Sequence, residues 1–291
     1  MDRDNIHIVR FMGGLGNQLF EYALYKVFKE KGFETYADTT GFDKPEETRN
    51  LQLPFLGIEL DEASYKDICR LYCAPDNIIM KAIIKRTGKK TYFRQRELFF
   101  EDRVLLAEQG YFDGYWQSYK YFEGFEEKIK KSISFKSFEN ENANIISPDE
   151  ETVSIHVRLG DYLDNQAMYG GICTKLYYDK AISYIKKIIH ETTGKDPYFY
   201  IFSNDIEKTK DLLNDKEFEY IEGHSEEEGY KDLHLMSLCK HHIIANSSFS
   251  WWGAFLGETQ DSITIAPSKW VNGMRAEDIL PDRWIRMSGD I

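Results

Sequence analysis

The second half of the chain alternates short apolar segments with longer helical ones, and this alternation restricts the folds that it can form. The expected strands are residues 153–157, 198–202, 219–221, 242–245 and 262–266, and the helices between them are residues 176–191, 206–213, 230–239 and 249–256. Strands that are joined through helices pair in parallel, because the crossover needs about the length of a helix. We therefore expect a Rossmann-like α/β half with a parallel sheet.

The first half opens with a strand, a glycine-rich turn and a helix. Residues 5–12 are mostly apolar, the sequence Gly-Gly-Leu-Gly-Asn-Gln follows at residues 13–18, and apolar residues then recur at helical spacing over residues 19–28. A second strand is expected at residues 33–37. This order predicts a βαβ unit whose glycine-rich turn lies at a helix N-terminus.

A turn of this kind can bring backbone N–H groups close to an anion. It is not a P-loop, because no Lys follows the glycines, and it is not a dinucleotide fingerprint, because Leu19 stands where a third Gly is needed. The amides of Asn17 and Gln18 favour a polar ligand or a helix cap. A tight turn without any ligand is the alternative interpretation.

A polar segment separates the two halves. Residues 138–151 are rich in Asn and Glu and contain Pro148, which is typical of a linker. A length of 291 residues allows two domains of ordinary size. We therefore predict an N-terminal domain over residues 1–147 and a C-terminal domain over residues 148–291.

The first strand of the second half ends in residues that suit a phosphate. His156 lies in the strand, Arg158 follows it directly, and Asp161 comes after a turn at Gly160. Ligands bind at the carboxyl ends of the strands in open parallel sheets. Arg suits a phosphate because its donors are fixed and its charge is permanent. A pairing of Arg158 with Asp161 that only locks the turn is the alternative.

Small polar residues follow two more strands of this half. These residues are Ser203 and Asn204 after one strand, and Asn246, Ser247 and Ser248, followed by Phe249, after another. The second group opens a helix, so its hydroxyl and N–H groups can either cap that helix or hold a phosphate. Three such strand ends on one edge favour a shared ligand crevice.

Asp232 and the aromatic stretch at residues 110–125 are further candidates. Asp232 lies near a helix start, where it can favour the helix dipole or accept the two N–H groups of a guanine edge. Trp116 and Gln117 end a predicted strand and can face a sugar, although core packing explains most of the aromatic residues. The other histidines, including His224, lack metal-ligand spacing and are interpreted as structural or exposed.

Composition excludes some partners. A net charge of −12 argues against nucleic-acid binding. The chain shows no signal peptide, no Cys-x-x-Cys pair and no apolar run of about 20 residues, so we expect a cytoplasmic protein. Residues 78–96 mix basic and apolar side chains, which predicts peripheral contact with an anionic membrane or, alternatively, a solvated helix face. The one Asp-x-Asp pair, at residues 2–4, is poorly placed for a metal.

Three motifs together resemble glycosyltransferase family 11, the α-1,2-fucosyltransferases. The matching stretches are residues 13–20, 156–162 and 246–254, in the same order and spacing over essentially the whole chain. Residues 232–234 also resemble a stretch in the wider clan of inverting fucosyltransferases, in which the acidic residue contacts guanine. The resemblance implies a GT-B-like α/β fold, with two Rossmann-like halves facing across a cleft.

The resemblance also implies an activity. It is the inverting, metal-independent transfer of L-fucose from GDP-β-L-fucose to the 2-OH of a terminal β-galactoside. The acceptor would be a galactose-terminated glycan, including a lipid-linked one, in surface-polysaccharide or O-antigen type synthesis. Two alternatives stay open: a nucleotide-sugar-binding protein without turnover, and a different Rossmann-fold enzyme.

Residue roles follow from the same resemblance. Arg158, Asp161 and Asn17 are the catalytic candidates, and Asp161 would serve either as the base or as a partner that holds Arg158. Trp116 and Gln117 are the acceptor candidates, and no residue is expected to bind a metal. The donor-binding candidates are Gly14, Gly16, Gln18, His156, Arg158, Ser203, Asn204, Asp232, Asn246, Ser247, Ser248 and Phe249.

Overall fold

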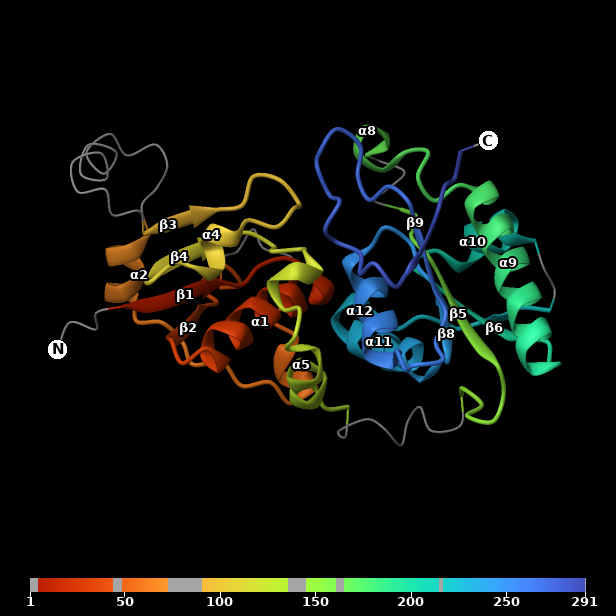
Figure 1. The fold of residues 1–291 in the computed structure, drawn as a ribbon, viewed down its shortest axis with the longest axis horizontal. Helices are drawn as coiled ribbons and strands as arrows, with labels where there is room; N and C mark the ends of the chain where they lie inside the picture. The colour runs from red at the N-terminus through yellow and green to blue at the C-terminus, as the bar shows by residue number, and fades with distance from the viewer. Residues whose placement is uncertain are drawn as a thin grey trace. The chain divides into compact units, whose positions relative to one another are not determined.

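The computed structural model describes residues 5–43, 49–72, 91–135, 145–160, 165–214 and 217–290. The chain divides into two compact units, Met1–Ile133 and Ser134–Ile291 (Figure 1). Each unit is an α/β structure with its own parallel sheet, so the expected pair of Rossmann-like halves is confirmed. Much of the polar segment between the halves lies outside the described residues, and the boundary after residue 147 stays a prediction.

The N-terminal unit has a four-stranded sheet in the order β2-β1-β4-β3. Its strands are β1 (Ile6–Arg10), β2 (Glu34–Asp38), β3 (Tyr92–Arg94) and β4 (Gly110–Asp113). Its helices are α1 (Leu15–Glu30), η1 (Leu53–Leu56), α2 (Tyr65–Leu71), α4 (Asp102–Leu105), η2 (Tyr119–Tyr121) and α5 (Glu126–Ser132). The glycine-rich turn joins β1 to α1, as the sequence predicted. Most of the basic stretch at residues 78–96 lies outside the described residues, so membrane contact stays a prediction.

The C-terminal unit has a six-stranded sheet in the order β10-β9-β8-β5-β6-β7. Its strands are β5 (Thr152–Val157), β6 (Tyr198–Ser203), β7 (Glu219–Tyr220), β8 (His241–Ile243), β9 (Thr264–Pro267) and β10 (Ile285–Met287). Its helices are α8 (Gln166–Tyr169), α9 (Lys175–Thr193), α10 (Ile206–Leu213), η3 (Glu226–Glu228), α11 (Gly229–Leu238) and α12 (Ser248–Gly257). The five expected strands are confirmed, and β10 is an addition.

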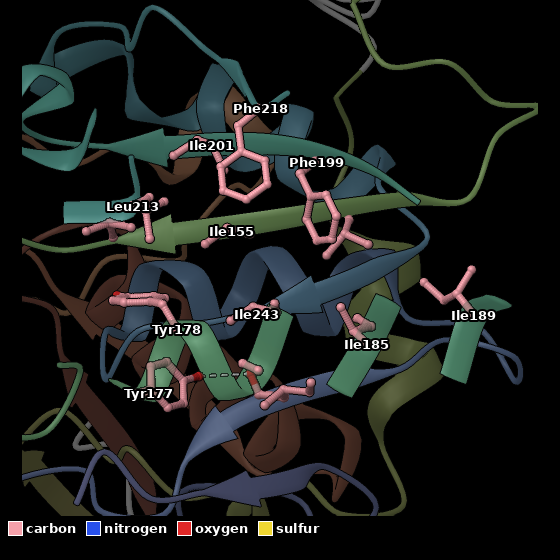
Figure 2. Packing of buried hydrophobic residues seen from close by; sticks show 14 residues of the cluster. Ile155, Tyr177, Tyr178, Ile185, Ile189, Phe199, Ile201, Leu213, Phe218 and Ile243 are labelled. Carbon is pink, nitrogen blue, oxygen red and sulfur yellow. Dashed lines mark hydrogen bonds between the residues drawn. The ribbon is translucent and has the colours of Figure 1, made fainter. Parts of the chain in front are cut away.

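Alternate residues of each strand face opposite layers of helices in this unit. In β6, Phe199 and Ile201 pack in the cluster that includes α9, whereas Tyr200 and Phe202 pack against α11. Figure 2 shows the α9 side, where Ile185 lies under the sheet together with its neighbours. Because α9 and α10 cover one face and α11 and α12 the other, only the ends of the strands are left open to a ligand (Figure 1).

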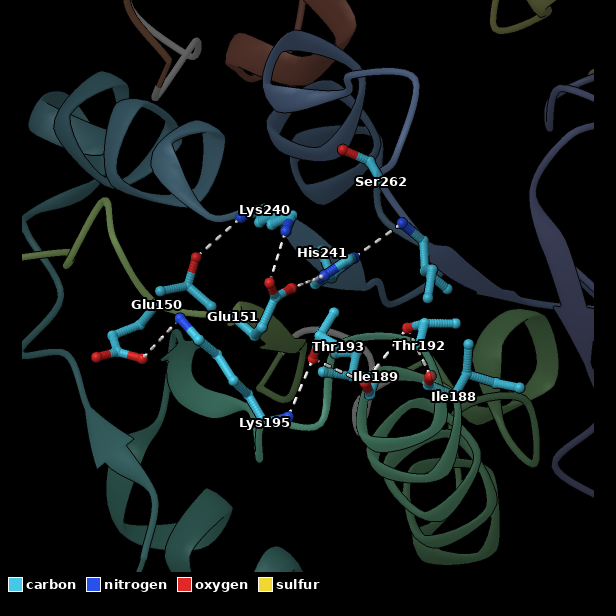
Figure 3. A network of polar contacts seen from close by, with 12 residues as sticks. Glu150, Glu151, Ile188, Ile189, Thr192, Thr193, Lys195, Lys240, His241 and Ser262 are labelled. Carbon is cyan, nitrogen blue, oxygen red and sulfur yellow. Dashed lines mark hydrogen bonds and ion pairs between the residues drawn. The ribbon is translucent and has the colours of Figure 1, made fainter.

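A polar network fixes the amino ends of β5 and β8 (Figure 3). Glu151 bonds Lys240 at 2.7 Å and Nε2 of His241 at 3.0 Å, while the backbone N–H of Ile263 donates to Nδ1 of His241. An Nδ1 that accepts a bond carries no proton, so His241 is neutral and donates from Nε2 to Glu151. Burial agrees with this, because it lowers the pKa of His241 despite the nearby carboxylate. The network is structural and lies at the end of the sheet opposite the predicted ligand edge.

None of the helices within the described ranges combines the length and the apolar character needed to cross a bilayer.

His7 makes the stability of the N-terminal unit sensitive to acid. The ring is fully buried against Phe28, Phe33 and Phe112, and Nε2 lies 2.9 Å from the carbonyl oxygen of Ala107. Burial lowers the pKa of His7 from 6.5 to about 4. The unfolded chain takes up a proton below pH 6.5, which the folded unit resists until about pH 4. The contribution of His7 to stability is therefore fully present above pH 6.5 and is lost as the pH falls through this window, by about 3 kcal/mol.

We expect His7→Phe to remove this part of the acid sensitivity, since Phe fills the aromatic site and does not titrate. Urea unfolding of both proteins at pH 7 and pH 4 measures the effect. The wild type should lose more free energy of unfolding between the two pH values than the variant, by up to about 3 kcal/mol. Equal losses in the two proteins would show that His7 is not the group responsible.

Candidate functional site

The carboxyl ends of the strands in the C-terminal unit bring the main candidates together. Val157, the last residue of β5, pairs with Ser203, the last residue of β6. Arg158 follows at once and is partly exposed. Asp161 lies outside the described residues, so both of its predicted roles, base and partner of Arg158, stay predictions.

His156 contributes a neutral imidazole to this edge. The side chain is buried, its ring lies 5.9 Å from that of Phe249 at the start of α12, and its carbonyl oxygen accepts the hydroxyl of Tyr178 at 3.1 Å. Burial, helped by the charge of Arg158, lowers the pKa of His156 to about 3. Nδ1 has no hydrogen-bond partner within the described part of the chain. His156 therefore contributes a buried, uncharged ring beside Arg158, which supplies the positive charge at this edge.

Asn204 holds the turn that presents Arg158. Its Oδ1 accepts the N–H of Leu159 at 2.8 Å, and its Nδ2 donates to the carbonyl oxygen of Leu159 at 3.1 Å. Gly160 has a positive φ of 63°, and a Cβ atom there would lie 2.9 Å from Nδ2 of Asn204. Because the Asn204 amide already bonds Leu159 from both ends, its place in the structure is that of a clamp rather than a direct ligand contact.

The hydroxyl of Ser203 is also engaged within the protein. It accepts the N–H of Asp205 at 3.1 Å and the hydroxyl of Thr209 at 2.8 Å, at the start of α10. Asp205 is the N-cap of α10 and accepts the N–H of Lys208 at 3.2 Å, so Ser203 supports the turn before the helix, and bonds within the protein account for its hydroxyl.

The turn before α12 differs from the one before α10. Ser247 is the N-cap residue, yet within the described structure its side chain makes no capping bond. Asn246 is buried, donates from Nδ2 to the carbonyl oxygen of Trp270 at 2.9 Å and lies 3.4 Å from the thiol of Cys173. Ser248 and Phe249 are partly exposed at the first turn. Ser247 therefore does not cap α12 through its side chain, and anion binding by this turn stays a prediction.

Asp232 lies in the first turn of α11 and is paired with one residue. His224 donates its backbone N–H to Oδ2 at 3.1 Å, and its Nδ1 lies 2.6 Å from Oδ1. Burial raises the pKa of Asp232, although both contacts with His224 oppose that rise. Nothing in the sequence pattern connects His224 with this carboxylate, because the pattern shows only that the two residues are near in the chain.

In the N-terminal unit, the glycine-rich turn brings Asn17 next to Gln117. Oδ1 of Asn17 accepts Nε2 of Gln117 at 2.6 Å. A Cβ atom on Gly13 would lie 2.8 Å from Nδ2 of Asn17 and 3.2 Å from the ring of Tyr115, so this close approach needs glycine. Gly14 is the N-cap of α1, and Gly16 is buried in its first turn. The structure thus unites two predicted residues that are 100 positions apart.

Gln18 supports the glycine-rich turn through buried hydrogen bonds. Its side chain is fully buried, with Nε2 donating to the carbonyl oxygens of Gly13 and Asn50, and with Oε1 accepting the N–H of Gln52. A ligand could reach this amide only at the expense of these bonds, so the structure favours an architectural role over the predicted donor contact.

The prediction that Trp116 faces a sugar is corrected by its burial. The side chain is 1% exposed and packs against Phe112 and Tyr121. Its backbone has a positive φ of 53°, held by a bond from its N–H to the side chain of Gln95. Aromatic residues of this stretch gain more from the core than from a solvent-exposed position. The neighbouring Tyr115, by contrast, is 36% exposed.

A row of alternating charges, which the sequence did not indicate, ends the strands of the N-terminal sheet. Asp38, Arg10, Asp113 and Arg94 are the last residues of β2, β1, β4 and β3, and the strands pair in register there. Arg10 bonds Asp113 at 2.9 Å. The hydroxyls of two tyrosines below the row donate to its acids, Tyr111 to Asp38 and Tyr92 to Asp113. In-register neighbours share a face, so the four charged side chains lie on one face of the N-terminal sheet, at the carboxyl ends of its strands.

No group of three or more His, Cys, Asp or Glu side chains within the described ranges has an arrangement that could hold a metal ion. Asp2 and Asp4 lie outside those ranges, and independence from metal stays a prediction.

Two α/β units, each with its own parallel sheet, are the architecture that the sequence resemblance implied, and comparison with known proteins identifies the family. The chain matches the family described as glycosyl transferase family 11 over residues 5–288. It belongs to that family, the α-1,2-fucosyltransferase family, as the three motifs implied.

Two relatives and one solved structure show what the chain is similar to. An Escherichia coli alpha-1,2-colitosyltransferase is 32% identical over 299 residues, covering 97% of this chain and 99% of that protein. The Escherichia coli O-antigen biosynthesis glycosyltransferase WbnK is 35% identical over 146 residues, covering 49% of this chain and 47% of that protein. A mutant of Arabidopsis thaliana FUT1, solved in complex with GDP, matches with a TM-score of 0.54 at 12% identity, covering 91% of this chain and 71% of that one. This structural likeness shows the fold alone.

Proposed function

We propose that the protein transfers L-fucose, with inversion, from GDP-β-L-fucose to the 2-OH of a terminal β-galactoside during surface-polysaccharide or O-antigen type synthesis. The observation that carries the proposal is the Arg158 turn. A permanent cation follows the last residue of the central strand β5, and Asn204 clamps the backbone of the next residue, Leu159. The ring of His156 lies 5.9 Å from that of Phe249 at the start of α12. This set of groups suits a diphosphate.

The proposed chemistry uses charge that is already in place. Cleavage of the bond between fucose and phosphate builds negative charge on GDP and positive charge on the sugar. Arg158 and the N–H groups that open α12 would stabilise the departing diphosphate. The acceptor hydroxyl attacks from the opposite face, which inverts the anomeric carbon, and gives its proton to a base. Asp161 is our candidate for that base. Asp232 would hold guanine through its carboxylate.

For the acceptor we propose the turn in the N-terminal unit. Asn17 is partly exposed and offers an amide group that suits sugar hydroxyls, the buried Gln117 holds it in place, and the exposed ring of Tyr115 offers a stacking face. Tyr115 takes the place that the sequence had suggested for Trp116. The acceptor would be a galactose-terminated glycan, and a lipid-linked form would agree with the basic stretch at residues 78–96.

A second donor is favoured by a specific observation. The relative that matches nearly the whole chain is described as a colitosyltransferase. Colitose is fucose without its 3-hydroxyl, so GDP-colitose would fit the same nucleotide contacts. Both donors would therefore make the same nucleotide contacts with the C-terminal unit, and their sugars differ only in the 3-hydroxyl.

Competition between the two donors tests the assignment. We expect kcat/KM to favour GDP-fucose over GDP-colitose by at least about 10²-fold in excess EDTA, because a site that bonds the 3-hydroxyl rejects the analogue that lacks it. UDP-galactose should not serve as a donor. A preference for GDP-colitose would transfer the proposal to that sugar, and turnover only with added Mg²⁺ or Mn²⁺ would contradict the metal-independent mechanism.

A further inference from the structure

His224 presents two N–H donors side by side to one carboxylate. Its backbone N–H bonds Oδ2 of Asp232, and its Nδ1 bonds Oδ1. A carboxylate accepts and does not donate, so Nδ1 carries its proton here. Both oxygens of Asp232 are thus taken by a single residue, and 16% of the Asp232 side chain remains exposed.

The edge of guanine offers the same arrangement. Its N1–H and its amino group lie next to each other and point the same way, so a carboxylate can accept both at once. Each oxygen has a second lone pair, but only 16% of the side chain is exposed, so the carboxylate has little room to accept the guanine pair while His224 stays bonded.

We propose that His224 stands in for the guanine edge on Asp232 and competes with it, so that nucleotide binding exchanges one pair of N–H donors for another. This inference rests on the proposed function, which assigns guanine recognition to Asp232. The number of hydrogen bonds at the carboxylate is the same before and after the exchange. Asp232 then rejects bases that lack the two donors without making GDP bind tightly.

The segment that carries His224 is suited to move away from Asp232. It joins β7 to α11, and residues 222–228 contain no buried side chain. Gly223 passes beside the end of β6, where a Cβ atom would lie 3.4 Å from the carbonyl oxygen of Ser203 and 3.6 Å from Oδ2 of Asp232. A segment without core contacts opens at a small free-energy cost. Weaker product binding is also useful, because release of the nucleotide often limits turnover.

Calorimetric titration of GDP into two His224 variants tests the competition. His224→Ala removes one competing donor, and we expect it to bind GDP about 3- to 10-fold more tightly, the worth of one ordinary hydrogen bond. His224→Gln keeps an N–H donor of similar reach and should bind GDP like the wild type. Inorganic pyrophosphate carries no guanine, so its affinity should be equal in the wild type and in both His224 variants.

His190→Ala is the matched control. His190 also pairs with an acid, Asp196, at 3.1 Å in the same unit, but on the exposed side of α9, so GDP affinity should not change. Weaker or unchanged GDP binding in a folded His224→Ala would overturn the competition, because His224 would then orient Asp232 or be irrelevant to it. Asp232→Ala distinguishes a failure of the His224 competition from a failure of the proposed guanine site. Its GDP affinity should fall, and an unchanged value would overturn both this inference and the proposed guanine site.

Discussion

Replacing Arg158 with alanine is expected to lower kcat by about 10²- to 10³-fold while the melting temperature stays close to that of the wild type. The guanidinium would meet the diphosphate at the point where negative charge grows, so it binds the transition state more strongly than the donor. Loss of one such contact costs about 2.7–4 kcal/mol of transition-state stabilisation. Arg158 is partly exposed and follows the last residue of β5, so its removal leaves no cavity in the core.

Arg158→Lys should recover only part of the lost rate, because an ammonium group cannot bond two phosphate oxygens in the geometry of a guanidinium. Arg275→Ala is the matched control, since Arg275 is an exposed arginine of the same unit that pairs with Glu277 at 3.2 Å. Its kcat should be unchanged. An Arg158→Ala protein that keeps most of its kcat would rule out the catalytic role. One that loses activity only in proportion to its folded fraction would show that Arg158 locks the turn instead.

Replacing Trp251 with alanine is expected to destabilise the C-terminal unit by about 3–5 kcal/mol. The side chain is fully buried, its Nε1 donates to the carbonyl oxygen of Ile279 at 3.0 Å, and its ring packs between those of Phe255 and Trp284. The change removes these contacts, leaves a cavity and orphans a buried carbonyl oxygen. Urea unfolding followed by circular dichroism measures the loss.

Trp251→Phe should cost less than the alanine variant, since it keeps an aromatic ring and loses the hydrogen bond. Tyr198→Ala provides the control for deletion of an aromatic side chain, because Tyr198 is 57% exposed at the start of β6. We expect that control to stay within about 1 kcal/mol of the wild type. A Trp251→Ala protein that unfolds at the wild-type urea concentration would contradict the packing described here.

The regular part of the fold was predictable from the sequence, because apolar and β-branched segments of strand length alternate with segments of helical spacing. In β5 every side chain is buried, and its apolar residues Val153, Ile155 and Val157 are all β-branched, which is typical of a strand. The strand β10 escaped prediction because it is short and its residues are only partly buried. The helix α2 buries only Leu71, so its sequence carries no apolar stripe to recognise.

The sequence indicated which positions belong to the candidate site, but it did not indicate which contacts those residues make. Arg158 and Ser247 follow strands, and a strand end is visible in the sequence. The clamp from Asn204 to Leu159 joins residues 45 positions apart, and nothing in the local sequence indicates it. The same reason explains why the burial of Trp116 was missed, since its partner Gln95 comes from another loop. Contacts of this kind are set by the tertiary fold.

Analysis of the reaction product tests the central claim most directly. Purified protein would be incubated with GDP-β-L-fucose and a β-galactoside in excess EDTA, and the product examined by proton and carbon NMR. The proposal predicts an α-fucosyl residue, identified by its anomeric coupling, joined to O2 of galactose, with one GDP released for each linkage formed. A β-linked product, a linkage to another galactose oxygen, or release of free fucose without transfer would contradict it.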